Sequence, residues 1–511
     1  MRKTFFAALI VLIIAAFFRF YNLGLLPPGL YPDEAMNGSN ALEAIQKNDF
    51  KVFYPENNGR EGLFINIQAA AIRLFGNEPW ALRSVSAIFG VLTVMGIFFL
   101  ARELMKRQDE DEKWMLGLKK SERIAFFAAL FAAVALWPVL FSRIGFRANM
   151  APCFIAWSLF LLIKSLPLIK ENILKALSIA LGGGLLFGLG MHSYIAYRAT
   201  PIIIAIIFFL KLPSAIKEKY AFKLTSIFAA FTVASILAFT PLALHFIDNP
   251  ADFMGRTTQV SVFSSGSPVA TLALNTIKTL GMFNIVGDFN WRHNYSGDPL
   301  LSPLTGAFFI AGIAICAVMI VKSFKKRSDE DPLPAVVLFS SFGVALLPVI
   351  TSSEGIPHAL RAILAVPPVF IFAGMGAEWF FGKIKSWLGD KKTPNTLFKL
   401  SLIAFVVFIV AEGFILYFIR WGGNFNIQGA FAKNFVDMAR EINSLPDAQK
   451  KYILVRGNGV DVRGWPMPTQ TVMFLTDTFL PENRPAKNII YIHSVSEIPQ
   501  GEKNYSLFVI D

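Results

Sequence analysis

The sequence predicts a polytopic α-helical membrane protein with about eleven transmembrane helices and a small C-terminal α/β domain. Its 511 residues are 54% hydrophobic and only 16% charged, a balance too apolar for a soluble globular chain. Apolar runs of roughly 17 to 22 residues, long enough to cross about 30 Å of hydrocarbon, recur along most of the chain. Basic residues gather in every second connection between these runs.

The apolar runs define the expected spans, some of them shortened by Gly and Pro. The runs are Thr4–Tyr21, Ser84–Leu104, Ile124–Phe141, Met150–Ile163, Ala176–Met191, Thr200–Leu210, Leu224–Leu244, Ser302–Val321, Ala335–Ile350, Ala362–Phe381 and Leu400–Ile419. The first run follows Arg2 and Lys3 and has no obvious small-residue cleavage site after it. We therefore expect an uncleaved anchor and not a signal peptide.

Lys and Arg set the expected orientation, because basic residues in short connections stay on the cytoplasmic side. They precede the first span and cluster near residues 106–120, 164–175, 211–219, 322–327 and 383–392. This alternation predicts a plasma (inner) membrane protein with a cytoplasmic N-terminus and its C-terminal domain outside. The net charge of +13 largely reflects this bias, so it indicates contact with anionic lipid and gives no reason to expect nucleic acid.

The outer side carries the long loops, at residues 22–83 and 245–301. An acidic pair, Asp33-Glu34, follows the first span within the first of these loops. One interpretation is that the two carboxylates cap a helix and complement its dipole. The other is that they perform chemistry where a hydrophobic helix meets water. A second helix of this loop, from Leu63 to Phe75, has apolar residues at helical spacing and is expected to lie along the membrane interface.

Four Arg residues lie at the outer ends of spans, against the inside bias: Arg143, Arg147, Arg198 and Arg361. A single Arg there is most often an anchor to lipid headgroups. Four of them with His and Tyr nearby indicate a ring of cationic donors, and the guanidinium fork suits phosphate. In the second long loop, Trp291 and Tyr295 flank Arg, His and Asn, which is typical either of carbohydrate binding or of an aromatic belt at the interface.

Six short motifs in this order resemble the GT-C glycosyltransferases, and the resemblance covers about Met1 to Arg420. The branch it resembles most contains the bacterial relatives of dolichyl-phosphate-mannose protein mannosyltransferases and of the lipid A aminoarabinose transferase. The motifs are Asp33-Glu34, Arg60-Glu61-Gly62-Leu63-Phe64, Ser142-Arg143-x-Gly145-x-Arg147, His192-Ser193-Tyr194-x-x-Tyr197-Arg198-x-x-Pro201, Asn290-Trp291-Arg292-His293-Asn294 and Pro357-His358-Ala359-Leu360-Arg361.

The resemblance implies transfer of a sugar on the outer face, with inversion, from a polyprenyl-phosphate-linked donor to a protein, lipid or glycan acceptor. Asp33 is then the expected general base, with Glu34 beside it as the second catalytic carboxylate. Arg143, Arg147, Arg198 and Arg361 are expected to bind the departing phosphate as it gains charge. The expected substrate-binding residues are Arg60, Glu61, His192, Tyr194, Tyr197, Trp291, Arg292, His293, Asn294 and His358.

One stretch departs from the aminoarabinose branch, which has a Glu-Lys-Pro step where this chain has Gly59-Arg60-Glu61-Gly62. No metal or phosphate role carries over to it. The sequence shows no His/Asp/Glu set with compelling metal-ligand spacing, so a divalent metal is compatible with the sequence but is not predicted by it. The chemistry requires no cofactor, because Arg can neutralise the phosphate.

The domains expected are a GT-C-like catalytic domain over residues 1–420 and an outer α/β domain over residues 421–511. In the latter, predicted helices at Ala430–Leu445 and Thr469–Phe479 alternate with strands at Tyr452–Val455, Ile489–Ile492 and Ser506–Ile510. The main alternative function is a lipid or sugar transporter or flippase, in which ionisable residues lie near the bilayer midplane. A receptor or assembly scaffold is a further alternative.

Overall fold

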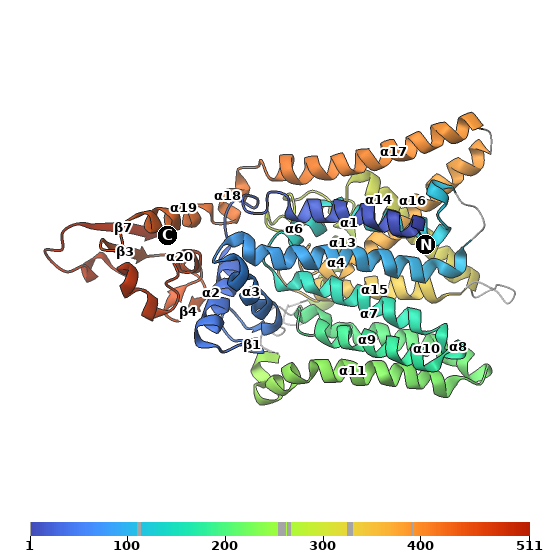
Figure 1. The fold of residues 1–511 in the computed structure, drawn as a ribbon, viewed down its shortest axis with the longest axis horizontal. Helices are drawn as coiled ribbons and strands as arrows, with labels where there is room; N and C mark the ends of the chain where they lie inside the picture. The colour runs from blue at the N-terminus through green and yellow to red at the C-terminus, as the bar shows by residue number, and fades with distance from the viewer. Residues whose placement is uncertain (1, 110–113, 254–261, 263–266, 324–330, 390–391) are drawn as a thin grey trace.

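The computed structural model describes the chain except for residues 1, 110–113, 254–261, 263–266, 324–330 and 390–391. Long helices run side by side along the longest axis, and the C-terminal region extends beyond one end of the bundle (Figure 1). We call this end, which also carries α2 (Pro32–Lys47) and α3 (Gly62–Phe75), the loop end.

Ten helices in the described part of the chain are long and apolar enough to cross a membrane, and a bent pair makes an eleventh. The protein is therefore a multi-pass helical membrane protein, as predicted. The helices of these spans are α1 (Arg2–Phe20), α4 (Pro79–Met105), α5 (Lys120–Val134) with α6 (Leu136–Ser142), α7 (Met150–Ser165), α9 (Ile173–Gly190), α10 (Pro201–Lys217), α11 (Ala221–Asp248), α14 (Pro303–Ser323), α15 (Leu333–Ile350), α16 (Val366–Leu388) and α17 (Lys392–Phe414).

The bent pair α5 and α6 differs from the continuous span expected over residues 124–141. The two helices meet at an angle of 60°. Pro138 accounts for the break, because proline has no N–H to donate to the carbonyl four residues earlier, at Val134. The buried Arg19 guanidinium donates to the carbonyls of the two preceding residues, Ala133 and Ala132, at 2.7 and 3.1 Å, and so satisfies part of the broken end.

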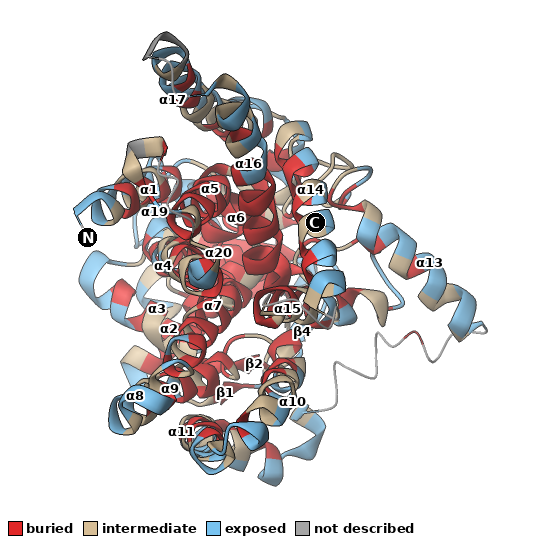
Figure 2. Ribbon diagram, turned by 90° about the vertical axis from the view of Figure 1, so that its right-hand side faces the viewer, coloured by how far each residue is buried: buried red, intermediate tan, exposed pale blue. Residues whose placement is uncertain are grey.

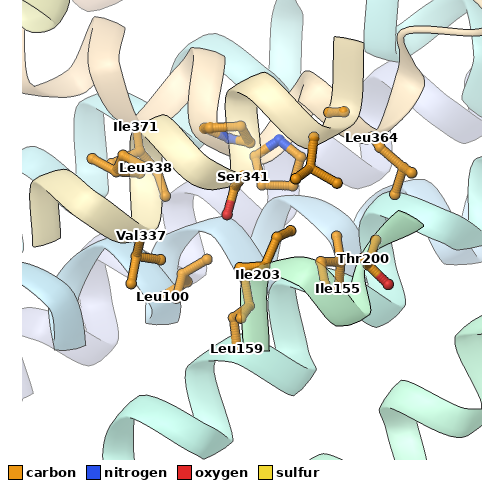
Figure 3. Close-up of a pocket in the computed structure, with 14 residues that line it drawn as sticks. Leu100, Ile155, Leu159, Thr200, Ile203, Val337, Leu338, Ser341, Leu364 and Ile371 are labelled. Carbon is orange, nitrogen blue, oxygen red and sulfur yellow. The ribbon is translucent and has the colours of Figure 1, made fainter. Parts of the chain in front are cut away.

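Buried residues gather along the middle of the bundle, whereas α13 (Pro268–Gly281) and α17 lie at its periphery (Figure 2). Both of these helices carry exposed apolar residues, among them Ile277 and Leu400. Such faces suit contact with lipid. One small cavity of about 10 Å³ lies between α4, α7, α15 and α16, with room for roughly one water molecule. Its walls are mostly apolar, and the Ser341 hydroxyl lies among them (Figure 3). This space is a gap in core packing.

The C-terminal region is a small α/β unit, as predicted. A parallel sheet has the order β6-β3-β7, formed by Ile489–Ile492, Lys450–Val455 and Tyr505–Ile510. Helices α18 (Asn426–Ala430), α19 (Lys433–Ser444) and α20 (Thr469–Leu475) accompany it, as does the hairpin of β4 (Asp461–Val462) and β5 (Trp465–Pro466). Helix α20 packs on α2, which attaches this region to the loop end.

Candidate active site

Asp33 lies in the first turn of α2, a helix that begins with Pro32 after an extended Tyr31. Its side chain is half-buried, and Asn57 Nδ2 donates to its Oδ1 over 2.6 Å. Asn57 belongs to the turn between β1 (Phe53–Tyr54) and β2 (Arg60–Glu61), which pair antiparallel. A carboxylate with one fixed oxygen and a partly open environment can accept a proton from a bound hydroxyl.

Glu34, the second residue of the acidic pair, has a different environment. Its side chain is fully buried and lies 3.0 Å from Arg83 Nε in an ion pair. The backbone N–H groups of Gly145 and Tyr31 also donate to it, at 2.7 and 3.3 Å. The capping interpretation therefore describes Glu34, whose bonds join α2, α4 and the turn after α6.

The predicted pair Arg60 and Glu61 forms strand β2, and both side chains are buried. Arg60 donates to Asn37 over 2.7 Å and to Asn40, both on α2. The next residue, Gly62, is required by space, since a Cβ there would lie 2.1 Å from the carbonyl oxygen of Lys51. The pairing of β1 with β2 and the close packing at Gly62 fix the position of Glu61, whose side chain reaches Arg147 and Arg198.

Glu61 lies between Arg147 and Arg198. Its Oε2 accepts from Arg147 Nε over 2.7 Å, and its Oε1 lies 3.5 Å from Arg198 Nη2. Burial raises the pKa of Glu61, but Arg147 and Arg198 outweigh that effect, and the pKa falls below its ordinary value. Arg147 uses its Nε in this contact, and among the described residues no hydrogen bond of its two terminal nitrogens is found. A guanidinium held by Nε can bind an anion through its terminal nitrogens.

Arg198 is held by aromatic rings as well. Its guanidinium lies over the rings of Phe246 and Phe253, at 4.8 and 4.4 Å, and Nη1 donates to the Phe253 carbonyl. Two arginines from separate connections thus meet at one carboxylate. The resulting cluster carries one net positive charge next to the β1–β2 turn.

The structure does not bring the other two predicted arginines to this cluster. Arg143 is fully buried and donates to Tyr417 Oη and to the carbonyls of Phe18, Tyr21 and Leu26, at 2.7 to 3.0 Å. These bonds use the guanidinium to join α1, α6 and the segment after α17. Arg361 donates to the Ser352 hydroxyl and, over 2.9 Å, to the Glu354 carbonyl.

A second cluster forms where residues 287–301 meet the turn before α16. Asp288 Oδ2 lies 2.9 Å from His293 Nδ1 and 3.8 Å from His358 Nδ1, and the two imidazole rings are 4.9 Å apart. The backbone N–H of Ala359 donates to the same oxygen over 2.8 Å. This cluster joins two connections and places His293 and His358 together.

Asp288, His293 and His358 also form a candidate metal-ligand set among the described residues, with one ligand atom of each within 4.8 Å of the others. Imidazole and carboxylate are ligand types that zinc accepts. However, both carboxylate oxygens of Asp288 already accept hydrogen bonds, Oδ1 from the Asn290 N–H at 2.8 Å. Asp288 is thus held in place by hydrogen bonds, and we assign no step to a metal.

The second loop also contacts the start of α2. The Arg292 guanidinium lies 4.0 Å over the ring of Tyr31, two residues before Asp33. Trp291 packs against Tyr295, with ring centroids 4.8 Å apart, and its carbonyl accepts from Trp421 Nε1. Asn294 is buried and donates to the carbonyls of Asp288 and Asp298. Arg292 therefore brings this loop against Tyr31, at the start of α2.

The remaining predicted residues lie in the connection between α9 and α10. His192 is buried, with Nε2 3.0 Å from the Ala238 carbonyl, and burial lowers its pKa. The Tyr197 ring is buried 5.5 Å from that of Phe187 and fills the space beside Gly190. Tyr194 is half-buried and packs against the core. Of this motif, Arg198 is the residue that reaches Glu61.

Three important residues were missing from the predicted site: Asn57, Arg83 and Asp288. Arg83 had the same signal as the predicted arginines, a basic residue at the outer end of an expected span. Asp288 stood in the polar stretch before Trp291. Asn57 had no sequence signal beyond its place in a turn-rich segment, and only the fold brings it to Asp33.

Comparison with protein-family models and with curated protein sequences finds no match. Solved structures do match. The oligosaccharyltransferase of Archaeoglobus fulgidus, tethered with an acceptor peptide, is 14% identical and has a TM-score of 0.51. The oligosaccharyltransferase AglB from Archaeoglobus fulgidus, in complex with an inhibitory peptide and a dolichol-phosphate, is 13% identical and has a TM-score of 0.53. In both comparisons the match covers 93% of this chain but only 63% of theirs.

ArnT from Cupriavidus metallidurans, bound to undecaprenyl phosphate, is also similar. It is 13% identical, with a TM-score of 0.52, and the match covers 98% of this chain and 91% of that one. AglB and ArnT are GT-C glycosyltransferases. The helix bundle, with its loop-end elements and C-terminal α/β region, therefore has the GT-C fold, as the six motifs predicted.

Proposed function

We propose that this protein is a membrane glycosyltransferase that moves a sugar from a polyprenyl-phosphate-linked donor to an acceptor, with inversion. The main supporting observation is that the β1–β2 hairpin contacts both the proposed base and the two arginines proposed to bind the phosphate. Asn57 bonds the half-buried Asp33, and Glu61 bonds Arg147 and Arg198. A base and a cationic pair, each held in place, meet the requirements of acid–base catalysis and of phosphate departure.

In the proposed reaction, the acceptor oxygen attacks the anomeric carbon as the bond from that carbon to the phosphate oxygen breaks. Asp33 takes the acceptor proton, and the electron pair of the broken bond remains on the polyprenyl phosphate. The terminal nitrogens of Arg147, with Arg198, stabilise the charge that develops on that phosphate. Attack from the side opposite the leaving group inverts the anomeric configuration.

Arg292, His293, His358 and Arg361 are proposed to contact the donor from the other side of the site. The Arg292–Tyr31 stack supports this arrangement, because it brings the second loop to the start of α2. The undecaprenyl phosphate in the ArnT structure and the dolichol-phosphate in the AglB structure support a lipid phosphate as ligand. The acceptor proposed is a protein, lipid or glycan of the cell envelope.

We further propose that the loop end faces outward from the plasma (inner) membrane. The basic clusters at residues 106–120, 164–175, 211–219, 322–327 and 383–392 then face the cytoplasm, in agreement with the positive-inside rule. Accessibility of single cysteines introduced at Asn58 and at Lys385 to a membrane-impermeant reagent tests this orientation. Labelling of the Lys385 position and not of the Asn58 position in intact cells would contradict it.

The test of function is transfer of labelled sugar by the purified protein in lipid, from polyprenyl-phosphate-sugar donors to extracted envelope components. Asp33→Asn should abolish transfer and leave the protein folded. Asp49→Asn is a matched control, because Asp49 is an exposed carboxylate of the same loop. Equal activity of Asp33→Asn and wild type would refute the base assignment. Movement of lipid across the bilayer without transfer would favour a transporter.

A further inference from the structure

Arg463 occupies an unusual backbone position in the C-terminal region. It forms, with Gly464, the two-residue turn of the β4–β5 hairpin, and the two residues have φ of 55° and 86°. Such a turn with two positive φ angles favours Asn, Asp or Gly. A long side chain at this position is unfavourable for the backbone, and such residues are often retained because the side chain has a role.

The Arg463 side chain reaches out of its own region and binds two carboxylates at the loop end. Its Nη1 and Nη2 lie 3.1 and 2.8 Å from the two oxygens of Glu43, on α2. Nη2 also lies 2.5 Å from Glu56 Oε1. The guanidinium lies 4.7 Å from the centroid of the Phe479 ring, which fixes its direction. Figure 1 shows β4 beside α2 and the β1 hairpin.

Glu56 begins the turn that carries the partner of Asp33. The next three residues, Asn57, Asn58 and Gly59, all have left-handed backbone, with φ of 53°, 63° and 79°. The Glu56 carbonyl accepts from the Gly59 N–H and from Arg60 Nε, at 3.3 and 3.2 Å. Asn and Gly adopt this backbone more readily than other residues, so the sequence permits the turn, and the Glu56–Arg463 contact fixes where it lies beside α2.

We propose that Arg463 is a positioning residue for the active site. It holds the 55–59 turn through Glu56, and this turn directs Asn57 Nδ2 at Asp33 Oδ1. The C-terminal α/β region therefore completes the site by supplying the clamp on its base. This inference rests on the proposed function for its effect on catalysis, but the clamp itself is a property of the loop.

The experiment compares Arg463→Ala, Glu56→Gln and Glu43→Gln in the full chain. Arg463→Ala and Glu56→Gln should each lower kcat about tenfold to a hundredfold, because a small displacement near the base has an effect of that order. The donor KM should change less than about twofold, because neither residue contacts Arg147 or Arg198. Glu43→Gln should retain more activity, because the Glu56 contact remains.

The double variant Arg463→Ala/Glu56→Gln should be no worse than Arg463→Ala alone, because Arg463→Ala already removes the contact to Glu56. Arg440→Ala is the matched control: Arg440 is an exposed arginine of the same region, paired with Asp437 on α19, and its loss should leave kcat unchanged. The proposal would be overturned if the loss of kcat in Arg463→Ala were explained by a lower Tm. It would also be overturned if Arg440→Ala lost as much kcat.

Hydrogen exchange of the 55–61 segment supplies a readout that does not need activity. Arg463→Ala should increase exchange there and leave strands β3 and β7 unchanged. If the wild-type protein transfers no sugar but this exchange rises, the proposed function fails and the clamp stands. If transfer occurs and Arg463→Ala changes neither kcat nor the exchange of this segment, the clamp fails and the function stands.

Discussion

The Glu34 carboxylate lies 3.0 Å from Arg83 Nε, and both side chains are fully buried. The neighbouring Asp33 is half-buried and bonded to Asn57. The first turn of α2 thus places two consecutive carboxylates in different environments. The buried one joins α2 to α4, and the more open one remains available for proton transfer. Substitution should separate these roles.

Glu34→Gln is expected to destabilise the protein by about 3–5 kcal/mol, because it leaves a buried guanidinium without its counter-charge. The measurement is the thermal unfolding midpoint in detergent. Asp33→Asn should shift that midpoint far less while removing transfer. Equal destabilisation by the two substitutions would contradict this division.

Asn57→Gly is expected to lower the transfer rate about tenfold, because it removes a hydrogen bond to a charged carboxylate worth roughly 1.5 kcal/mol or more. Glycine keeps the left-handed backbone of Asn57, so the turn itself should persist. Asn58→Gly serves as the control, since Asn58 has the same backbone conformation next to Asn57. A similar loss of rate in both variants would show that the turn, and not the hydrogen bond, matters.

Glu61→Gln is expected to destabilise the protein in a pH-dependent way. The pKa of Glu61 in the folded protein is below its ordinary value of 4.5, because Arg147 and Arg198 favour the charged form more than burial opposes it. A lowered pKa stabilises the fold above the unfolded value, and that contribution is lost as pH falls through the folded one.

The difference in unfolding midpoint between wild type and Glu61→Gln should therefore be constant from pH 7 to about pH 5 and shrink below about pH 4.5. Because both proteins are measured across this range, the contributions of the other carboxylates to the pH dependence cancel in the difference. A difference that grows as pH falls would reverse the assigned sign.

Arg143→Lys is expected to reduce stability, and Arg147→Lys is expected to reduce phosphate binding. Arg143 bonds three carbonyls and a hydroxyl inside the protein, so its loss should reduce stability by at least about 2 kcal/mol. Arg147→Lys keeps a charge near Glu61 but loses the planar fork. It should weaken polyprenyl phosphate binding about tenfold with little change in stability. Binding of undecaprenyl phosphate and thermal unfolding distinguish the two outcomes.

Much of the fold was predictable because its signals are local in sequence. Apolar runs predicted the spans, since a helix that crosses hydrocarbon must be apolar along its whole length. Alternating helices and strands predicted the C-terminal α/β region. The break between α5 and α6 also has a local cause in Pro138, although the prediction treated residues 124–141 as one span.

Sequence patterns were enough to predict the membrane-protein class, the approximate number of spans, the GT-C resemblance and the residue types available near the site. Which of these residues meet became clear from the folded chain. Glu34 pairs with Arg83, 49 positions away, and Arg463 reaches Glu43 across 420 positions. Hydrogen bonds and ion pairs act over a few ångströms, and distant residues come that close only when helices pack. Adjacent or similar residues such as Asp33 and Glu34, or Arg143 and Arg147, therefore look alike in sequence and differ in the folded protein.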